Sequence, residues 1–478
     1  MKNLLLILLL LIPSLVDAQG LLRRSGVNPR YFVAPPDTNW AQFLVGNHFW
    51  LSVQDQSGSF PPSAWPFSRD MDTISFNHNN FVRLWGGWSQ WRALVEGTDA
   101  WYFYPTLWYN TGSNVYNLDS VNQDFVDRTQ ERLDTLKERG VWGAVKLFEG
   151  WSIHHTGYTY DTWQYHPMNN HNTNSIAPAS QDIIHYAPSN GGDAAVWAIW
   201  VKYIKRMVDS LQFYDNFIWE IGNEIADYTG NNRHYAFVRL IIDTLKAYEG
   251  RKPKQHAIWN SGDWYTLNDS LFASRADAVG PGAGDNGVIW GNGSSVTTTI
   301  PDSLGSKAVL LDTDHLWGMI TVDGVWYVWR ALTHGAAGVV LQDNRAGTYP
   351  HWASDDPNWP AFKRASGVAN LMAQRVDLLH MAPSSICSTS DDEIAGESTG
   401  EVLVYQETGD FTINLTNYGT VNVLWVDSDD IQNGNIVCVA GTPTAGGASR
   451  TFTPPDARYD VLYLYTTEYK SKLITRAL

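Results

Sequence analysis

The chain has 478 residues and a formal net charge of −16, and 44% of its residues are hydrophobic. This length and composition exclude a disordered polymer and allow one large domain together with a small one. Because the chain has no dense block of lysine and arginine, its acidic balance argues against nucleic acid or an anionic membrane as a partner.

The first 18 residues have the pattern of a secretory signal peptide. A lysine at position 2 precedes the apolar run LLLILLLLI, and the segment SLVDA ends just before Gln19. This run is shorter than the roughly 20 residues of a membrane-spanning helix. We therefore predict cleavage after residue 18 and a secreted or periplasmic chain that is free of the membrane; the alternative is a retained N-terminal anchor.

Short apolar runs alternate with longer segments of helical period up to residue 382. Each run is followed by polar or glycine-bearing loop residues, which is typical of a strand that leads into a loop. The eight strand candidates are 43–52, 80–88, 141–151, 216–224, 256–263, 277–284, 307–315 and 338–343.

The helical period is clearest in the segment 194–212. Its apolar residues recur on one face, whereas Lys202, Lys205 and Arg206 fall outside that face. The residues of the apolar stripe are Val196, Trp200, Ile204, Met207, Val208 and Leu211. Similar stripes occur in 123–139 and 235–248.

Strand and helix patterns alternate eight times between residues 19 and 382. Strands that are buried on both faces of a parallel sheet read as continuous hydrophobic runs, so this alternation predicts an α/β fold, a closed (β/α)8 TIM barrel. An open doubly wound sheet is the alternative. It lacks its main signal here, because no glycine-rich phosphate loop follows the first strand.

Residues 383–478 have a different pattern. Short β-type runs such as EVLVY, DFTINL and DVLYLYTT are separated by turn residues, and no helical stripe is present, which predicts a small antiparallel β-sandwich. Both cysteines of the chain, Cys387 and Cys438, lie in this part. In an oxidising compartment a disulfide between them is expected; two unpaired thiols are the alternative.

The fourth strand candidate ends in an Asn-Glu pair, Asn223 and Glu224. In a barrel of this kind, residues at the carboxyl ends of the strands face the mouth where chemistry takes place. Glu224 can therefore present a carboxyl group there, and Asn223 can bond a substrate hydroxyl. Glu220, within the same strand, is expected to contribute to a polar interior layer.

The seventh strand candidate ends in two more acids, Asp312 and Asp314, next to His315. Alternation along a strand places the two aspartates on the same face. Hydrolysis of a glycoside normally needs two carboxyl groups, one to protonate the leaving oxygen and one to stabilise or attack the sugar carbon. The alternative for this acidic pair is a helix cap or a solvated loop.

These strand ends, together with Arg83 on the second strand candidate, resemble the clan A glycoside hydrolases, a superfamily of retaining (β/α)8 enzymes. Within the clan the sequence is most similar to the apiosidase-like branch, with which it shares the opening strand VGNHFWLSVQD and a C-terminal β-domain of the collagen-binding type, here EVLVYQETGDFTINL. The resemblance implies that Glu224 is the acid/base, that Asn223 contacts the 2-hydroxyl of the sugar, and that Arg83 orients the nucleophile.

The clan has a glutamate at the end of strand seven, and the matching position here is Thr313, between Asp312 and Asp314. An aspartate is one methylene shorter than a glutamate. The resemblance therefore implies Asp312 or Asp314 as the nucleophile of a retaining enzyme, and an inverting mechanism stays open.

The chain contains 23 tryptophans, and many lie in the predicted loops. Sugar faces pack on aromatic rings, and sugar hydroxyls bond to polar side chains nearby. Packing in the core is the alternative for each of these rings. Besides Asn223 and Arg83, the predicted substrate-binding residues are His48, Trp85, Trp151, His155, Trp259, His315 and Trp317.

We therefore expect a secreted glycoside hydrolase that binds a carbohydrate substrate and needs no metal or other cofactor. The alternative is a carbohydrate-binding barrel that has lost its chemistry.

Overall fold

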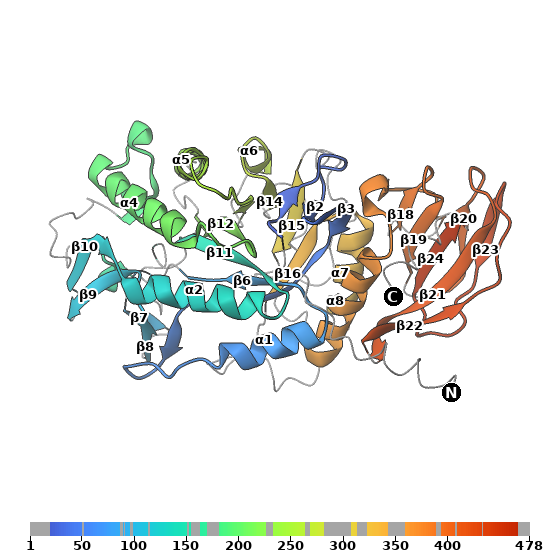
Figure 1. Cartoon of the computed structure of the whole chain (residues 1–478), viewed down its shortest axis with the longest axis horizontal. Helices are drawn as coiled ribbons and strands as arrows, with labels where there is room; N and C mark the ends of the chain where they lie inside the picture. The colour runs from blue at the N-terminus through green and yellow to red at the C-terminus, as the bar shows by residue number, and fades with distance from the viewer. Residues whose placement is uncertain are drawn as a thin grey trace, which may run out of the picture.

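The computed structural model describes most of the chain, including every strand of the barrel and the sheets that follow it. The described residues are 20–49, 52–86, 89, 91–95, 99–112, 115–150, 153, 163–169, 181–225, 233–262, 268–281, 307–312, 323–342, 359–388, 393–406, 409–432 and 434–466. Figure 1 shows the barrel in the middle of an elongated molecule, with the C-terminal strands at one end and β7–β10 at the other.

Eight parallel strands form a closed barrel in chain order. All eight strand candidates of the sequence are confirmed. The strands are β4 (Leu44–Phe49), β6 (Phe81–Leu84), β11 (Trp142–Glu149), β12 (Phe217–Asn223), β13 (Ile258–Ser261), β14 (Ala278–Gly280), β15 (Ala308–Asp312) and β16 (Gly338–Gln342).

Helices follow the strands and cover the outside of the barrel. They are α1 (Phe67–Phe76), α2 (Gln123–Lys137), α4 (Ala194–Leu211), α5 (His234–Glu249), α6 (Asn268–Phe272), α7 (Asp323–Thr333) and α8 (Trp359–Ala373). Asp193 caps α4, since its carboxylate accepts from the backbone amide of Ala195 at 2.6 Å. The apolar stripe predicted for this helix is buried throughout, as expected for a face packed on the barrel.

None of the described helices is long and apolar enough to cross a membrane.

The barrel interior is a core of its own. Leu44, Phe81 and Ala144 come from successive strands and belong to one buried cluster inside the ring. The N-terminal sheet, β1 (Arg23–Arg24), β2 (Phe32–Ala34) and β3 (Asp37–Gln42), contributes Phe32 and Ala34 to the same cluster. Because this cluster includes the first residues of several strands, the N-terminal sheet closes the end of the barrel opposite the mouth.

Two small antiparallel sheets are inserted in the loops that follow the first two barrel strands. One joins β5 (Asp55–Ser57), β8 (Asp99–Tyr104) and β7 (Arg92–Val95), and the other joins β9 (Trp108–Gly112) and β10 (Val115–Val121). These loops leave the carboxyl ends of β4 and β6, so the inserted sheets belong to the side of the barrel that carries the mouth.

The C-terminal region is built from antiparallel sheets, in agreement with the predicted fold class. A six-stranded sheet has the order β17 (Ala382–Pro383), β18 (Glu393–Gly396), β19 (Glu401–Tyr405), β24 (Val461–Thr466), β21 (Val421–Gln432) and β22 (Asn435–Ala440). A second sheet pairs β20 (Phe411–Asn414) with β23 (Ser449–Phe452).

Alternation along β19 divides its side chains between two cores. Val402 and Val404 pack in the cluster between the two C-terminal sheets, whereas Leu403 and Tyr405 join the cluster of the barrel helices. The ring of Trp329 on α7 stacks on Tyr405 with centroids 6.3 Å apart. Since one hydrophobic cluster continues from the barrel into the sheet, the domain boundary that we place after residue 382 stays a prediction.

The structure contradicts the predicted disulfide. The thiol of Cys387 is buried, whereas that of Cys438 is exposed, and the two are not bridged. The backbone of Cys387 pairs with that of Ile413 in the small sheet, whereas Cys438 lies on β22 opposite Val426. The two residues therefore belong to different sheets, a separation that the sequence did not indicate.

A buried carboxyl group on the C-terminal sheet makes stability depend on pH. Glu401 is 1% exposed and accepts hydrogen bonds from the hydroxyl of Tyr463 and the backbone amide of Asp377. Burial raises the pKa of Glu401 to about 7. Because the pKa of this carboxyl group is higher in the folded chain than in the unfolded chain, the group stabilises the fold when the pH is below its pKa in the unfolded chain. This contribution to the free energy of unfolding is lost as the pH rises through about 7.

Glu401→Gln removes the charge and keeps an acceptor for Tyr463. Between pH 4.5 and pH 8 we expect the free energy of unfolding of the wild type to fall by about 3 kcal/mol relative to this variant. Urea unfolding at pH 4.5, 6 and 8 measures the difference, and a difference that stays constant over this range contradicts the prediction.

Candidate active site at the mouth of the barrel

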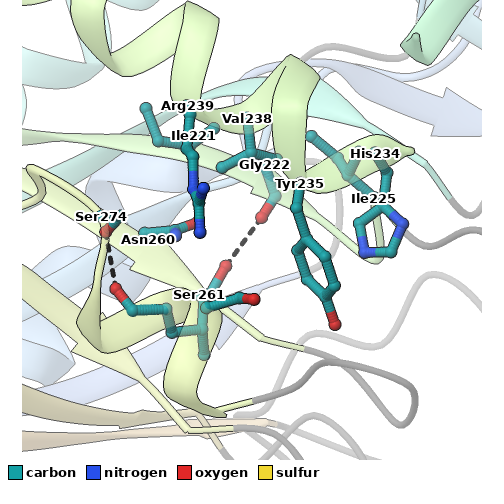
Figure 2. Close-up of a pocket in the computed structure, with 12 residues that line it drawn as sticks. Ile221, Gly222, Ile225, His234, Tyr235, Val238, Arg239, Asn260, Ser261 and Ser274 are labelled. Atoms are coloured by element: carbon teal, nitrogen blue, oxygen red, sulfur yellow. Dashed lines mark hydrogen bonds between the residues drawn. The ribbon is translucent and has the colours of Figure 1, made fainter. Parts of the chain in front are cut away.

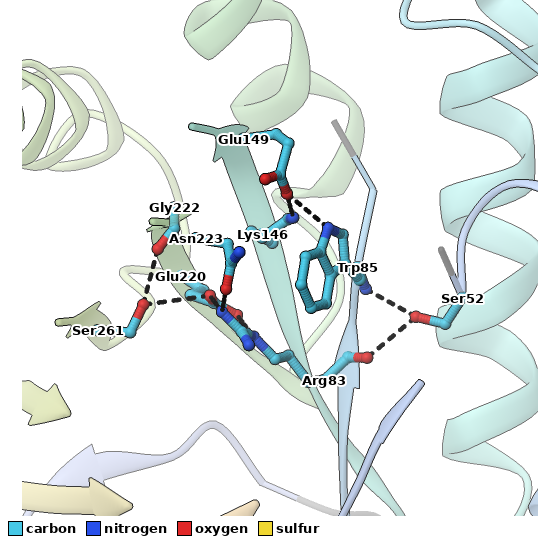
Figure 3. Close-up of polar contacts among 9 residues, drawn as sticks. All are labelled: Ser52, Arg83, Trp85, Lys146, Glu149, Glu220, Gly222, Asn223 and Ser261. Atoms are coloured by element: carbon cyan, nitrogen blue, oxygen red, sulfur yellow. Dashed lines mark hydrogen bonds and ion pairs between the residues drawn. The ribbon is translucent and has the colours of Figure 1, made fainter. Parts of the chain in front are cut away.

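An arginine inside the barrel anchors the end of the fourth strand. Arg83 on β6 donates from Nε to Glu220 at 2.7 Å, and its Nη2 also binds this carboxylate. Nη2 further donates to Oδ1 of Asn223 at 3.0 Å, and Ser261 donates to the Gly222 carbonyl at 2.7 Å (Figure 3). The side chains of Arg83 and Glu220 have no exposed area. The polar interior layer expected at Glu220 is therefore present.

The side-chain amide of Asn223 uses only one of its two polar atoms in the described hydrogen bonds. Its Oδ1 accepts from Arg83, whereas its buried Nδ2 has no partner in the described part of the chain. Buried donors are almost always satisfied in folded proteins, so such a group at a strand end indicates a place for water or a ligand.

A second network of buried charges lies beside the first, and sequence reasoning missed it. Glu149, the last residue of β11, accepts from Nε1 of Trp85 at 2.6 Å and pairs with Lys146. Lys146 also lies over the ring of Trp85, with Nζ 3.7 Å from the centroid. Figure 3 shows Trp85 between Lys146 and Arg83. The available signal was the pair of charges in VKLFE, an otherwise apolar run.

Burial shifts both members of this pair toward their neutral forms. It lowers the pKa of Lys146 to about 8, although the carboxylate of Glu149 opposes the shift. It also raises the pKa of Glu149, against the attraction of Lys146, and the negative charge of Glu224 adds to this rise. Glu149 and Glu224 therefore interact electrostatically.

Glu224 itself follows β12 directly and is partly exposed. Its φ angle is 47°, in the left-handed region that residues other than glycine seldom adopt. A residue held there costs of order 1–3 kcal/mol, and such strain gathers at functional sites. Gly150 makes the conformation possible, because a Cβ atom at that position would lie 2.0 Å from the carbonyl oxygen of Glu224.

Two predicted tryptophans are buried rather than open to a ligand. Trp259 has no exposed area and Trp85 only 2%. Both rings lie near the guanidinium of Arg83, with centroids 5.5 Å and 4.8 Å away. In contrast to the substrate-binding role that we predicted for them, Trp85, Trp259 and Arg83 pack against one another and present almost no surface to a sugar in this structure.

Asp312 is the last residue of β15 and is the register partner of Val340, a residue of the barrel-interior core. His48 lies on β4, where its backbone is paired in register with Arg83 and Gln342. The structure describes the backbone of both residues. The other predicted site residues lie outside the described residues: Trp151, His155, Asp314, His315 and Trp317.

A separate cavity lies beside β12 and β13, under α5 and α6 (Figure 2). Ser261 belongs both to its wall and to the Arg83 network, since Ser261 Oγ is 3.3 Å from the Glu220 carboxylate. No carboxylate is among the residues that line it: Ile221, Gly222, Ile225, His234, Tyr235, Val238, Arg239, Asn260, Ser261, Ser270, Leu271 and Ser274. It therefore does not replace the barrel mouth as the candidate active site.

Among the described residues, no group of three or more histidine, cysteine, aspartate or glutamate side chains could hold a metal ion.

No protein-family model matches the chain, and no curated protein matches it. Solved structures, in contrast, do match the chain. One described as a glycoside hydrolase has a TM-score of 0.59 and 13% identity, with 94% of this chain and 97% of the other covered. A glycoside hydrolase family 5 structure from Bacteroides vulgatus has a TM-score of 0.61 and 13% identity, with 94% and 93% covered. The chain therefore shares the fold of these glycoside hydrolases.

Proposed function

We propose that the protein is a glycoside hydrolase that acts at the mouth of the barrel, with Glu224 as the general acid and base. The observation that carries the proposal is the placement of Glu224. It lies at the carboxyl end of β12, partly exposed and in a strained backbone conformation, next to an asparagine that Arg83 holds in place. The solved structures of the same fold that are described as glycoside hydrolases support this proposal.

The second carboxyl group is proposed to come from the end of β15, either Asp312 or Asp314. Asp312 is the last residue of that strand and shares its register with a residue of the barrel interior. The two carboxyl groups lie about 5–5.5 Å apart in a retaining enzyme, where the second is the nucleophile, and about 6.5–9.5 Å apart in an inverting enzyme, where the second is a general base. We propose retention, by resemblance to clan A.

In this mechanism the Glu224 carboxyl protonates the leaving oxygen while the β15 carboxylate attacks the sugar carbon, and the glycosidic bond breaks. Glu224 then takes a proton from a water molecule that attacks the same carbon, which breaks the sugar–carboxylate bond and frees the β15 carboxylate. Asn223 is proposed to bond the 2-hydroxyl of the sugar through Nδ2, which is its unused donor among the described residues. Arg83 and Glu220 keep Asn223 oriented without touching the substrate.

We further propose that the protein belongs to the apiosidase-like branch of the clan and is secreted. The support is the sequence pattern of 1–18 and the motifs VGNHFWLSVQD and EVLVYQETGDFTINL. Mass spectrometry of the protein exported by its natural host tests the secretion, with Gln19 expected as the first residue.

The test of the activity is the release of reducing sugar from a panel of plant, algal and microbial polysaccharides by the wild type and by Glu224→Gln. Removing the proton-transfer group is expected to lower kcat/KM about a hundredfold or more. Glu138→Gln is the matched control, because its side chain is 75% exposed at the end of α2, and it should leave kcat/KM unchanged.

Proton NMR of the first anomer released distinguishes retention from inversion. Equal turnover by the wild type and Glu224→Gln would remove Glu224 from the mechanism. Binding of glycans without release of sugar by the wild type would favour the inactive carbohydrate-binding barrel.

A further inference from the structure

The cavity beside β12 and β13 has no part in the reaction as proposed above. Helices α5 and α6 cover the two strands there, and the cavity lies between strands and helices (Figure 2). Ile221, Val238 and Leu271 form the apolar part of its wall and belong to the core beneath the barrel helices. Because protein interiors are close-packed, an open space with polar side chains at this place needs an explanation.

The clearest sign of a ligand is the side chain of Asn260 on β13. This residue is 4% exposed, yet its amide makes no hydrogen bond in the part of the chain that the structure describes. Asn260 lines the cavity, and Figure 2 shows its amide directed into it. Buried polar groups nearly always have a hydrogen-bond partner, so this amide is expected to find one in the cavity.

Arg239 on α5 brings a positive charge to the same cavity. It is exposed, and its guanidinium forms no ion pair or hydrogen bond with any described residue. Asp243, four residues further along the helix, pairs with Arg275 at 2.8 Å instead. Carboxylates are absent from the lining residues. A guanidinium can bind two oxygens of a carboxylate or phosphate group at once, so the charge of Arg239 favours such a ligand.

The first turn of α5 adds to the positive potential. His234 and Tyr235 are the first two residues of this 16-residue helix, and both line the cavity. The side chain of the N-cap residue, Arg233, makes no capping hydrogen bond. The first amides of a helix have no partners within the helix, and they favour negative charge. The hydroxyl of Ser270 on α6 is a further donor that bonds to no described residue.

We propose that this cavity is a binding site for a small oxyanion, a carboxylate or a phosphate group. The guanidinium of Arg239 binds two of its oxygens, and Asn260 Nδ2 and the hydroxyl of Ser270 donate to it. Such a group can come from a free ion such as inorganic phosphate or from the carboxylate of an acidic sugar. The site is separate from the proposed catalytic residues, so this inference does not depend on the proposed function.

The first experiment is a calorimetric titration of the full chain with inorganic phosphate and with glucuronate, in a buffer free of both. Glucose is the neutral control. We expect one site per chain for at least one of the two anions and none for glucose. Binding of phosphate alone identifies a free ion as the ligand, and binding of glucuronate identifies an acidic sugar. No binding of either anion up to about 10 mM overturns the proposal.

The second experiment repeats the titration with Arg239→Gln, which is expected to weaken binding at least about tenfold, because a charge-assisted hydrogen bond is lost. Arg251→Gln is the matched control. Arg251 is also exposed, but it lies two residues beyond the end of α5 and does not line the cavity, so its replacement should leave the affinity unchanged. Equal affinities of the wild type and Arg239→Gln overturn the proposal.

Asn260→Leu replaces the amide by an apolar side chain of similar size. We expect it to weaken anion binding about tenfold. Without the anion, urea unfolding should show a variant at least as stable as the wild type, because a buried amide that lacks a partner is removed. An unchanged affinity contradicts the proposal. If this variant does not fold, Arg239→Gln still decides, since Arg239 is exposed. These measurements use no glycoside, so a failure of the proposed function leaves their result unaffected.

Discussion

Replacing Arg83 with methionine is expected to lower the free energy of unfolding by about 3–5 kcal/mol. Arg83 holds Glu220 through two hydrogen bonds, and neither side chain has any exposed area. The variant leaves the carboxylate of Glu220 buried without its cation, which is among the most destabilising changes that a single substitution can make. Urea unfolding followed by tryptophan fluorescence measures the difference.

Two further variants separate this effect from simple loss of charge. Arg275→Met breaks an ion pair with Asp243 on the surface, where the side chains are 69% and 51% exposed, and should cost less than about 1 kcal/mol. The double variant Arg83→Met/Glu220→Met removes both buried charges and should recover much of the lost stability. A single variant as stable as the Arg275 control would mean that Glu220 is neutral in the fold.

The barrel could be predicted from the sequence because its strands are buried on both faces. Each strand therefore reads as a continuous apolar run, and each covering helix has one apolar stripe, as α4 shows with Val196 and Trp200. Strand ends are equally visible, since a polar residue such as Asn223 directly follows the apolar run. The position of Glu224 just after β12 therefore follows from the local pattern of residues alone.

Whether a residue at a strand end is open to a ligand or buried in the barrel could not be predicted in the same way. Trp85 and Trp259 follow or end apolar runs as a sugar-binding tryptophan would, yet both are buried against Arg83. In the sequence, nothing distinguishes Lys146 and Glu149 from ordinary charged residues. The strand register shows that they are buried in the barrel together with Glu220. Their environment depends on strands that are distant in the sequence, and a local pattern contains no information about those strands.

The C-terminal sheets show the same limit. Their short β-type runs were visible in the sequence, but the pairing partners of the strands were not. Cys387 and Cys438 both lie in this region, yet they belong to different sheets, because β22 pairs with β21 whereas Cys387 bridges to Ile413. Two cysteines in one region are therefore a weak guide to a disulfide when the order of the strands is unknown.

Gly150→Ala is expected to lower kcat/KM about a hundredfold, although the substitution adds only one methyl group. The new Cβ atom would lie 2.0 Å from the carbonyl oxygen of Glu224 and 2.8 Å from the Cα atom of Ile225. These are backbone atoms, so a change of side-chain rotamer cannot relieve the clash. The backbone of Glu224 therefore has to move, and a displacement of about 1 Å at a catalytic group can cost a factor of about 100 in rate.

Stability should fall at the same time by about 1–3 kcal/mol, the usual cost of overpacking a close-fitting interior. Gly419→Ala is the matched control, because a Cβ atom at that position meets nothing within 4 Å. Comparing kcat/KM with the unfolding curve of each variant separates the two effects. A Gly150→Ala protein that keeps its activity within about threefold would mean that the backbone of Glu224 can shift without moving its carboxyl group, and its strained φ angle would then have no part in placing the acid.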